Sequence, residues 1–191
     1  PPQNVYFILL SRTLNIISTI KSRTIKFHLS GMNNDELGVS KEVYYFFDGN
    51  ENDILEFKRQ NLSLEDIQFK INTVEDILQI IFEMKNYMTG EFIIKNNLDL
   101  TVKYNKSIEL LARRIRFWDI ENVYFFINEI ENELKKEKEF LISFLSKIIV
   151  NVKHSVEAED LKKLINLKNS IRSNVNVKSV IFNFFDILQS S

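Results

Sequence analysis

Cysteine is absent from this chain of 191 residues, and histidine occurs only twice, at His28 and His154. Without cysteine there are no disulfide bonds, no thiolate catalysis and no zinc site built on thiolates, a composition typical of a reducing compartment. His28 and His154 are more than a hundred residues apart in the sequence, and neither has a second histidine nearby. We therefore expect no metal site.

Glycine and proline are scarce, with four and two residues, and both prolines stand at the start of the sequence. Because these residues are the strongest helix breakers, their scarcity predicts long helices and a mainly α fold. The chain is 45% hydrophobic and contains 16 phenylalanines, which is enough apolar material for a real core. We therefore expect a helical bundle.

Long hydrophobic runs are missing as well. No apolar run reaches the roughly 18 residues that a membrane helix needs, and no signal-peptide pattern opens the chain. We expect a soluble, cytoplasmic protein with no membrane partner. A phosphate-binding Gly-x-x-x-x-Gly-Lys-[Ser/Thr] loop is also absent from the sequence. The chain by itself is therefore not expected to bind ATP or to be an enzyme.

The charges nearly cancel, to a formal net charge of −1, but they are unevenly distributed. The near-neutral total argues against a nucleic-acid binder whose affinity depends on phosphate neutralisation. The first acidic residue is Asp35, so residues 1–34 form a local positive strip. Its basic residues are Arg12, Lys21, Arg23 and Lys26.

Three further arginines, Arg113, Arg114 and Arg116, stand beside Phe117-Trp118, a combination that would suit base stacking with phosphate contacts. The alternative is a solvated helix end, where cations are routine. We favour the helix end, because the chain as a whole is slightly negative.

Two strands are predicted near the N-terminal end. Residues 4–10 and 24–29 are rich in β-branched and aromatic side chains, and a short helix is expected between them over 13–20. Two strands do not make a stable sheet, so we expect them to need further strands from outside these residues. The turn-like composition of residues 30–34 predicts a linker.

From residue 35 onward the apolar spacing predicts one helix after another. The expected helices cover residues 35–47, 52–59, about 72 to the turn at Gly90, 104–117, 119–152, a segment around 161–171, and 177–188. The charged run 135–139 interrupts the apolar stripe of the longest helix and is a candidate kink or break. Phe182, Phe184 and Phe185 cannot all point inward from one helix, so we expect the helical bundle to carry exposed apolar surface for partners.

Two segments resemble a known family. An apolar run over residues 5–10 ends at Ser11 and is followed by Thr19-Ile20-Lys21-Ser22-Arg23. This stretch resembles the end of the ATPase core in clamp-loader subunits of the AAA+ family, where Thr-Ile-x-Ser-Arg-Cys precedes a final strand; Thr24 stands in place of the cysteine. Residues 164–181 resemble the last helices of the same family, which read Asn-x-Asn-x-(Lys/Arg)-x-x-(Leu/Ile) before a hydrophobic helix.

The resemblance implies three parts: residues 1–29 as the end of the AAA+ core, 30–68 as a helical lid, and 69–191 as a helical collar by which subunits form a ring. Because Pro1 stands directly before a predicted strand, we expect a C-terminal fragment of a longer subunit. The implied protein is a non-catalytic clamp-loader subunit of bacterial DNA polymerase III. Its implied partners are delta-type and gamma/tau-type subunits and, indirectly, the sliding clamp and primed DNA, with ATP bound by neighbouring subunits.

Arg23 is the residue to which the resemblance assigns a catalytic role. In the family the arginine of Ser-Arg-Cys reaches the ATP of a neighbouring subunit, so Arg23 is the implied arginine finger and Ser22 its local support. The alternative is a cation that caps a helix C-terminus. For the chain as a whole, the alternative to the clamp-loader subunit is a free-standing all-helical interaction scaffold.

Overall fold

The structure is a computed structural model that describes residues 8, 18–25, 30–65, 71–90, 97–173 and 175–191. The chain divides into two compact units, Pro1–Gly31 and Met32–Ser191. In the first unit the described residues include one short helix, α1 (Ser18–Lys21), which overlaps the end of the helix predicted over 13–20. The predicted strands 4–10 and 24–29 lie outside the described residues except at Ile8, Thr24 and Ile25, none of which is in a strand.

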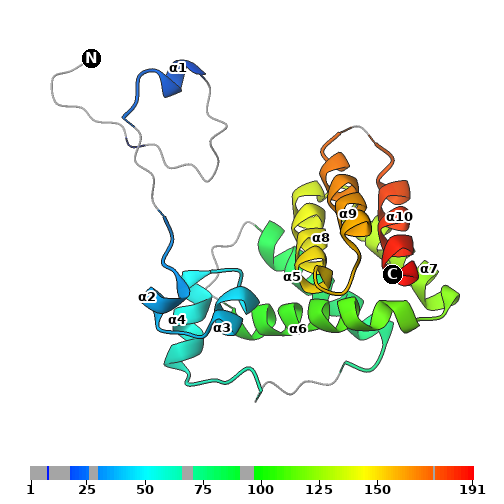
Figure 1. Ribbon diagram of the computed structural model, residues 1–191, viewed down its shortest axis with the longest axis horizontal. Helices are drawn as coiled ribbons and strands as arrows, with labels where there is room; N and C mark the ends of the chain where they lie inside the picture. Colours follow the sequence, from blue (N-terminus) through cyan, green and yellow to red (C-terminus); the bar gives the residue numbers. More distant parts are fainter. Residues whose placement is uncertain (1–7, 9–17, 26–29, 66–70, 91–96, 174) are drawn as a thin grey trace. The chain divides into compact units, whose positions relative to one another are not determined.

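The second unit is built from helices, and its described residues contain no strand (Figure 1). In chain order the elements are α2 (Asn34–Leu37), α3 (Lys41–Phe46), α4 (Glu51–Arg59), α5 (Val74–Thr89), α6 (Leu98–Arg114), a 3-10 turn η1 (Ile115–Phe117), α7 (Ile120–Leu134), α8 (Lys138–Val152), α9 (Ala158–Ser170) and α10 (Val177–Ser190). For the described residues this confirms the predicted helical bundle. The predicted division at 29/30 and 68/69 stays a prediction.

Side-chain caps define the three short helices. Asn33 accepts hydrogen bonds from two amides of α2, and Ser40 and Asn50 cap α3 and α4 in the same way. The prediction of a single helix over 35–47 is wrong. Gly38 ends α2 with a φ of 62°, a left-handed conformation that favours glycine, and Ser40 then begins a new helix.

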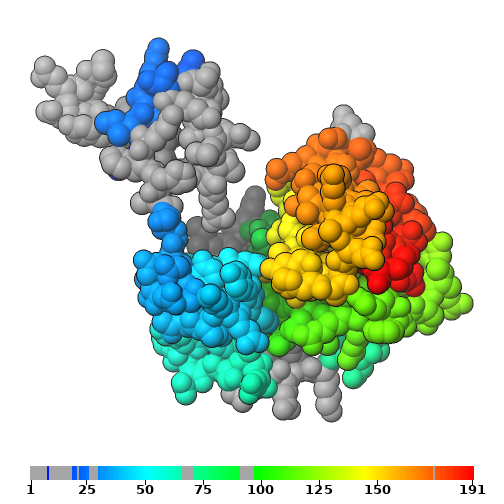
Figure 2. All heavy atoms as spheres, in the orientation of Figure 1, coloured from blue at the N-terminus to red at the C-terminus, as the bar shows by residue number. Residues whose placement is uncertain are grey.

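Helices α2–α4 share a small apolar core with one end of α6. Its buried residues are Leu37, Phe47, Ile54, Phe57, Leu98 and Val102, the last two from α6. The remaining core lies among α5–α10, where α6 packs against both α5 and α8. In Figure 2, α2–α4 (blue to cyan) lie on the left of the second unit, and α8–α10 (yellow to red) lie to their right.

Helix α10 packs against α7, α9 and η1. Phe184 and Phe185 are both fully buried, and Phe182 is partly buried with its ring 5.6 Å from that of Tyr124. Phe184 and Phe185 therefore contribute no exposed apolar surface, so this ground for the expectation is wrong. Two neighbouring residues of one helix are both buried here because α10 has helices on more than one side. Exposed apolar side chains of the bundle are found elsewhere, such as Phe117, Tyr124 and Phe125.

Several helix bounds follow the sequence closely. Helix α4 begins one residue before the predicted 52–59, and α10 ends two residues after the predicted 177–188. The segment 119–152 is two helices that break within the charged run, where α7 ends at Leu134 and α8 begins at Lys138. Helix α6 begins at Leu98 instead of residue 104, because Asn97 caps it by accepting from the amide of Leu100. Among the described residues, no helix is both long and apolar enough to cross a membrane.

Candidate functional site

Arg23 lies two residues beyond the end of α1, and its side chain is exposed. Its backbone N–H donates to the carbonyl of Ile20 at 3.1 Å. The hydroxyl of Ser22 donates to the carbonyl of Thr19 at 3.1 Å, and that of Thr24 to the carbonyl of Ile20 at 2.9 Å. These three bonds satisfy carbonyl groups at the end of α1, so Ser22 helps to shape the turn that carries Arg23.

An exposed guanidinium can donate two parallel hydrogen bonds to phosphate oxygens. Within the part of the chain that the structure describes, no carboxylate pairs with Arg23, and its side chain is exposed. The same exposure is compatible with a cation at a helix C-terminus, so the arginine-finger role stays a prediction.

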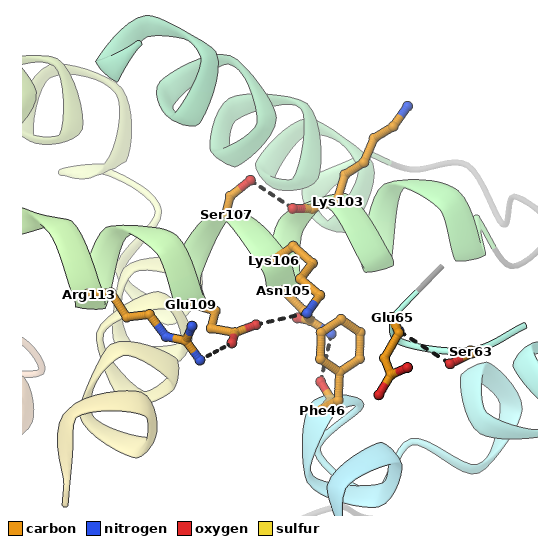
Figure 3. Close-up of polar contacts among 9 residues, drawn as sticks. All are labelled: Phe46, Ser63, Glu65, Lys103, Asn105, Lys106, Ser107, Glu109 and Arg113. Atoms are coloured by element: carbon orange, nitrogen blue, oxygen red, sulfur yellow. Dashed lines mark hydrogen bonds and ion pairs between the residues drawn. The ribbon is translucent and has the colours of Figure 1, made fainter. Parts of the chain in front are cut away.

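A polar cleft with a volume of about 340 Å³ lies where α3, α6 and α8 meet. Its cations have partners within the chain. Lys106 pairs with Glu109 at 3.2 Å (Figure 3), and the Nζ of Lys153 lies 5.8 Å from the ring centroid of Tyr45. Because its described lining has three lysines and three carboxylates, the cleft carries no net charge, and it has the character of a joint between helices.

Three residues at this cleft connect α2–α4 to the bundle; we call Asp48, Asn105 and Lys147 the polar joint. Asn105 is buried in α6, and its Nδ2 donates to the carbonyl of Phe46 at the end of α3, at 2.8 Å (Figure 3). The Oδ1 of Asn105 accepts from the Nζ of Lys147 at 2.9 Å, and Lys147 also forms an ion pair with Asp48. The polar joint therefore ties the end of α3 to α6 and α8.

Tyr104 lies beside the polar joint and is almost fully buried. Burial raises the pKa of its hydroxyl well above the ordinary value of 10.0, and the charge of Asp48 raises it further. The Nζ of Lys147 lies 5.8 Å from the ring centroid of Tyr104, which also packs 6.2 Å from the ring of Phe140. Tyr104 is therefore neutral at physiological pH and acts as a core residue.

The arginines near the end of α6 are engaged with their own chain. Arg113 pairs with Glu109, and Arg114 donates to the carbonyl of Ile71 at 3.4 Å. The ring of Trp118 packs 5.4 Å from that of Phe126 in the core. These contacts take Trp118 away from base stacking. Phe117 is 81% exposed, and among the described residues no ion pair of Arg116 is found, so the choice of a solvated helix end stays a prediction.

Of the two histidines, the structure describes only His154. His154 is exposed beyond the end of α8, and His28 lies outside the described residues. Among the described residues, no group of three or more histidine, aspartate or glutamate side chains could hold a metal ion.

Comparison with known proteins yields no relative: no family model, curated protein or solved structure matches the chain. The functional argument therefore rests on the residues themselves.

The polar joint was missed by the sequence reasoning. Lys147 is 99 positions from Asp48 and 42 from Asn105, so no local pattern links the three. One signal was present: Asn105 follows Leu98 and Val102 at helical spacing, on a face that would otherwise be read as apolar.

Proposed function

We propose that the chain is the C-terminal part of a delta-prime-type subunit of the bacterial DNA polymerase III clamp loader. In this role it assembles in the cytoplasm with delta-type and gamma/tau-type subunits into the ring that loads the sliding clamp onto primed DNA. The subunit is non-catalytic: it supplies Arg23, supported by Ser22, to the ATP bound by a neighbour, and needs no cofactor of its own.

The observation that carries this proposal is an order along the chain. The Thr19-Ile20-Lys21-Ser22-Arg23 pattern comes first, then three short helices around a small core that α6 completes, then a bundle of longer helices. The resemblance implies the same order of core end, lid and collar. The exposure of Arg23 adds support, because a finger must leave its own subunit to reach a neighbour's phosphate.

The test is the Arg23→Ala substitution in the complete subunit, reconstituted with delta-type and gamma/tau-type subunits. At the ATP site that receives the finger, we expect turnover to fall by about 10³-fold, while the ring still elutes as one complex on gel filtration. Arg23→Lys should also lower turnover, because lysine lacks the bidentate fork. The matched control is Arg59→Ala in α4, whose side chain is 77% exposed; it should change neither quantity.

Two results would contradict the proposal in different ways. Normal DNA-stimulated turnover in an assembled Arg23→Ala ring would assign Arg23 to the helix end. If the unmodified subunit did not assemble with the other clamp-loader subunits, the chain would instead be a free-standing helical scaffold.

A further inference from the structure

A shallow groove with a volume of about 460 Å³ runs between α5 and α7. Leu78 and Phe82 of α5 and Phe125 of α7 supply its apolar lining. Phe125 remains 40% exposed, although burial of a large aromatic side chain is strongly stabilising. The described residues therefore leave apolar surface in the groove uncovered.

The rim of the groove is acidic. Glu75, Glu83 and Glu129 all line it, and none of the lining residues that the structure describes is a lysine, arginine or histidine. Lys85 also lies on α5, but its Nζ is paired with Glu133 of α7 at 2.8 Å. The Nζ of Lys85 also lies 5.9 Å from the ring centroid of Phe82 in the groove. The described lining of the groove nevertheless has three carboxylates and no cation, whereas the polar cleft has three of each.

One wall of the groove is as long as a short helix. Along α5 it extends from Glu75 to Asn86, which is about three turns or 16 Å at helical rise. On the α7 side it extends over one turn, from Phe125 to Glu129. A groove with an apolar floor and a charged rim is the shape that receives the apolar face of an amphipathic helix.

We propose that this groove binds a partner protein through an amphipathic helix of about three turns whose apolar face is flanked by lysine or arginine. The charge of the rim selects this occupant, because an acidic helix would bring like charges together at Glu75, Glu83 and Glu129. A free peptide of this length is only marginally helical, so the helix folds on binding or belongs to a folded partner. The inference concerns the groove alone and does not depend on the proposed function.

The test uses the 191-residue chain and two fluorescent peptides of about 14 residues with the same leucine face. One peptide carries lysines on both flanks of that face, and the other carries glutamates at the same positions. We expect fluorescence anisotropy to detect binding of the lysine peptide only. The affinity should fall as salt is added, because the attraction at the rim is screened.

Two substitutions locate the binding site. Glu83→Lys reverses one rim charge, and Phe125→Ala removes the exposed ring; each should weaken binding of the lysine peptide by about tenfold or more. The matched control is Glu159→Lys on α9, the same charge change at a side chain that is 81% exposed and outside the groove. It should leave the affinity within about twofold of the parent chain.

The proposal would be overturned if Glu83→Lys and Glu159→Lys weakened binding equally. It would also be overturned if the two peptides bound equally well. Either result would mean that the attraction is non-specific. If Phe125→Ala loses its helical circular dichroism, Glu83→Lys decides, since Glu83 is exposed. A dimer of the chain in sedimentation that Phe125→Ala abolishes would make a second copy the occupant, which also overturns it. Failure to assemble with clamp-loader subunits bears on the proposed function and leaves the groove result unchanged.

Discussion

The short helices α2–α4 and the longer helices α5–α10 bury very different amounts of apolar side chain. Among the described residues, the core shared by α2–α4 and α6 contains six buried residues, and the core of the bundle contains 31. Helices α2, α3 and α4 have four, six and nine residues, whereas those of the bundle have 13 to 17. Because isolated helices shorter than about 12 residues are marginal in water, α2–α4 depend on contacts outside themselves.

Helix α6 supplies those contacts. Leu98 and Val102 complete the small core, and Asn105 on the same face belongs to the polar joint. On its other faces, Ile108 and Leu111 are buried in the bundle. The small helical group is thus an attachment to a bundle helix, and we expect it to unfold before the bundle does.

The largest effect should come from matched phenylalanine truncations in the two cores. Phe184→Ala removes a fully buried ring from the bundle and should lower the free energy of unfolding of the whole second unit by about 3–5 kcal/mol. Phe57→Ala removes an equally large ring from the small core, where it packs 5.2 Å from Phe47. Its effect should be confined to α2–α4. Urea denaturation followed by circular dichroism measures the first change, and amide hydrogen exchange the second.

In the Phe57→Ala chain, amides of α2–α4 should exchange rapidly while those of α8 and α10 keep their protection. Loss of protection throughout the bundle would mean that the two cores unfold together. That result would contradict the separate unfolding of α2–α4.

A smaller effect is expected at the polar joint. Lys147→Met removes the ion pair with Asp48 and leaves the buried Oδ1 of Asn105 without this donor. The side chain of Asp48 is 49% exposed, which screens the ion pair, so we expect a loss of about 1–2 kcal/mol, seen as faster exchange in α2–α4. Lys163→Met is the control, because Lys163 pairs only with carboxylates of its own helix, α9. Equal effects of the two substitutions would assign no special role to the joint.

The smallest effect should appear only in alkaline solution. Burial raises the pKa of Tyr104, so above its ordinary value of 10.0 the unfolded chain loses the proton before the folded chain does. The contribution of neutral Tyr104 to the free energy of unfolding is therefore fully present below pH 10.0 and declines above it. At pH 11 the loss should be about 1 kcal/mol. Urea denaturation at pH 8 and at pH 11 measures how much the free energy of unfolding falls between the two. In the Tyr104→Phe chain this fall should be smaller by that amount.

Tyr45→Phe is the matched control, because Tyr45 is 63% exposed. If Tyr104→Phe and Tyr45→Phe gave the same pH dependence as the parent chain, burial of Tyr104 would not contribute to alkaline unfolding.

Much of the secondary structure was predictable because its causes are local. Asn50 and the residues after it encode α4, and the charged run at 135–139 marks the end of α7. Residues 35–47 were predicted as one helix because the apolar pattern continues across them. In the structure, Gly38 ends one helix and Ser40 begins the next. Those two residues carried the missing signal, a left-handed position followed by an N-cap.

The candidate sites were less predictable. Arg23 was identified by a short pattern that lies within five consecutive residues. The polar joint and the groove each combine side chains from helices that are far apart in the sequence, such as Asp48 with Lys147 and Phe82 with Phe125. Apolar spacing marks a face for burial, but it does not say which other helix covers that face or how completely.

The amino-acid sequence by itself determined that this chain is helical, because the scarcity of breakers, the caps and the apolar spacing act within a few residues of one another. Only the tertiary structure decided which apolar and polar side chains are covered. Phe184 and Phe185 are both buried because α10 has several neighbours, and Phe125 stays exposed because no described helix covers the groove. Burial is a property of neighbouring surfaces, and those surfaces meet only when the chain has folded.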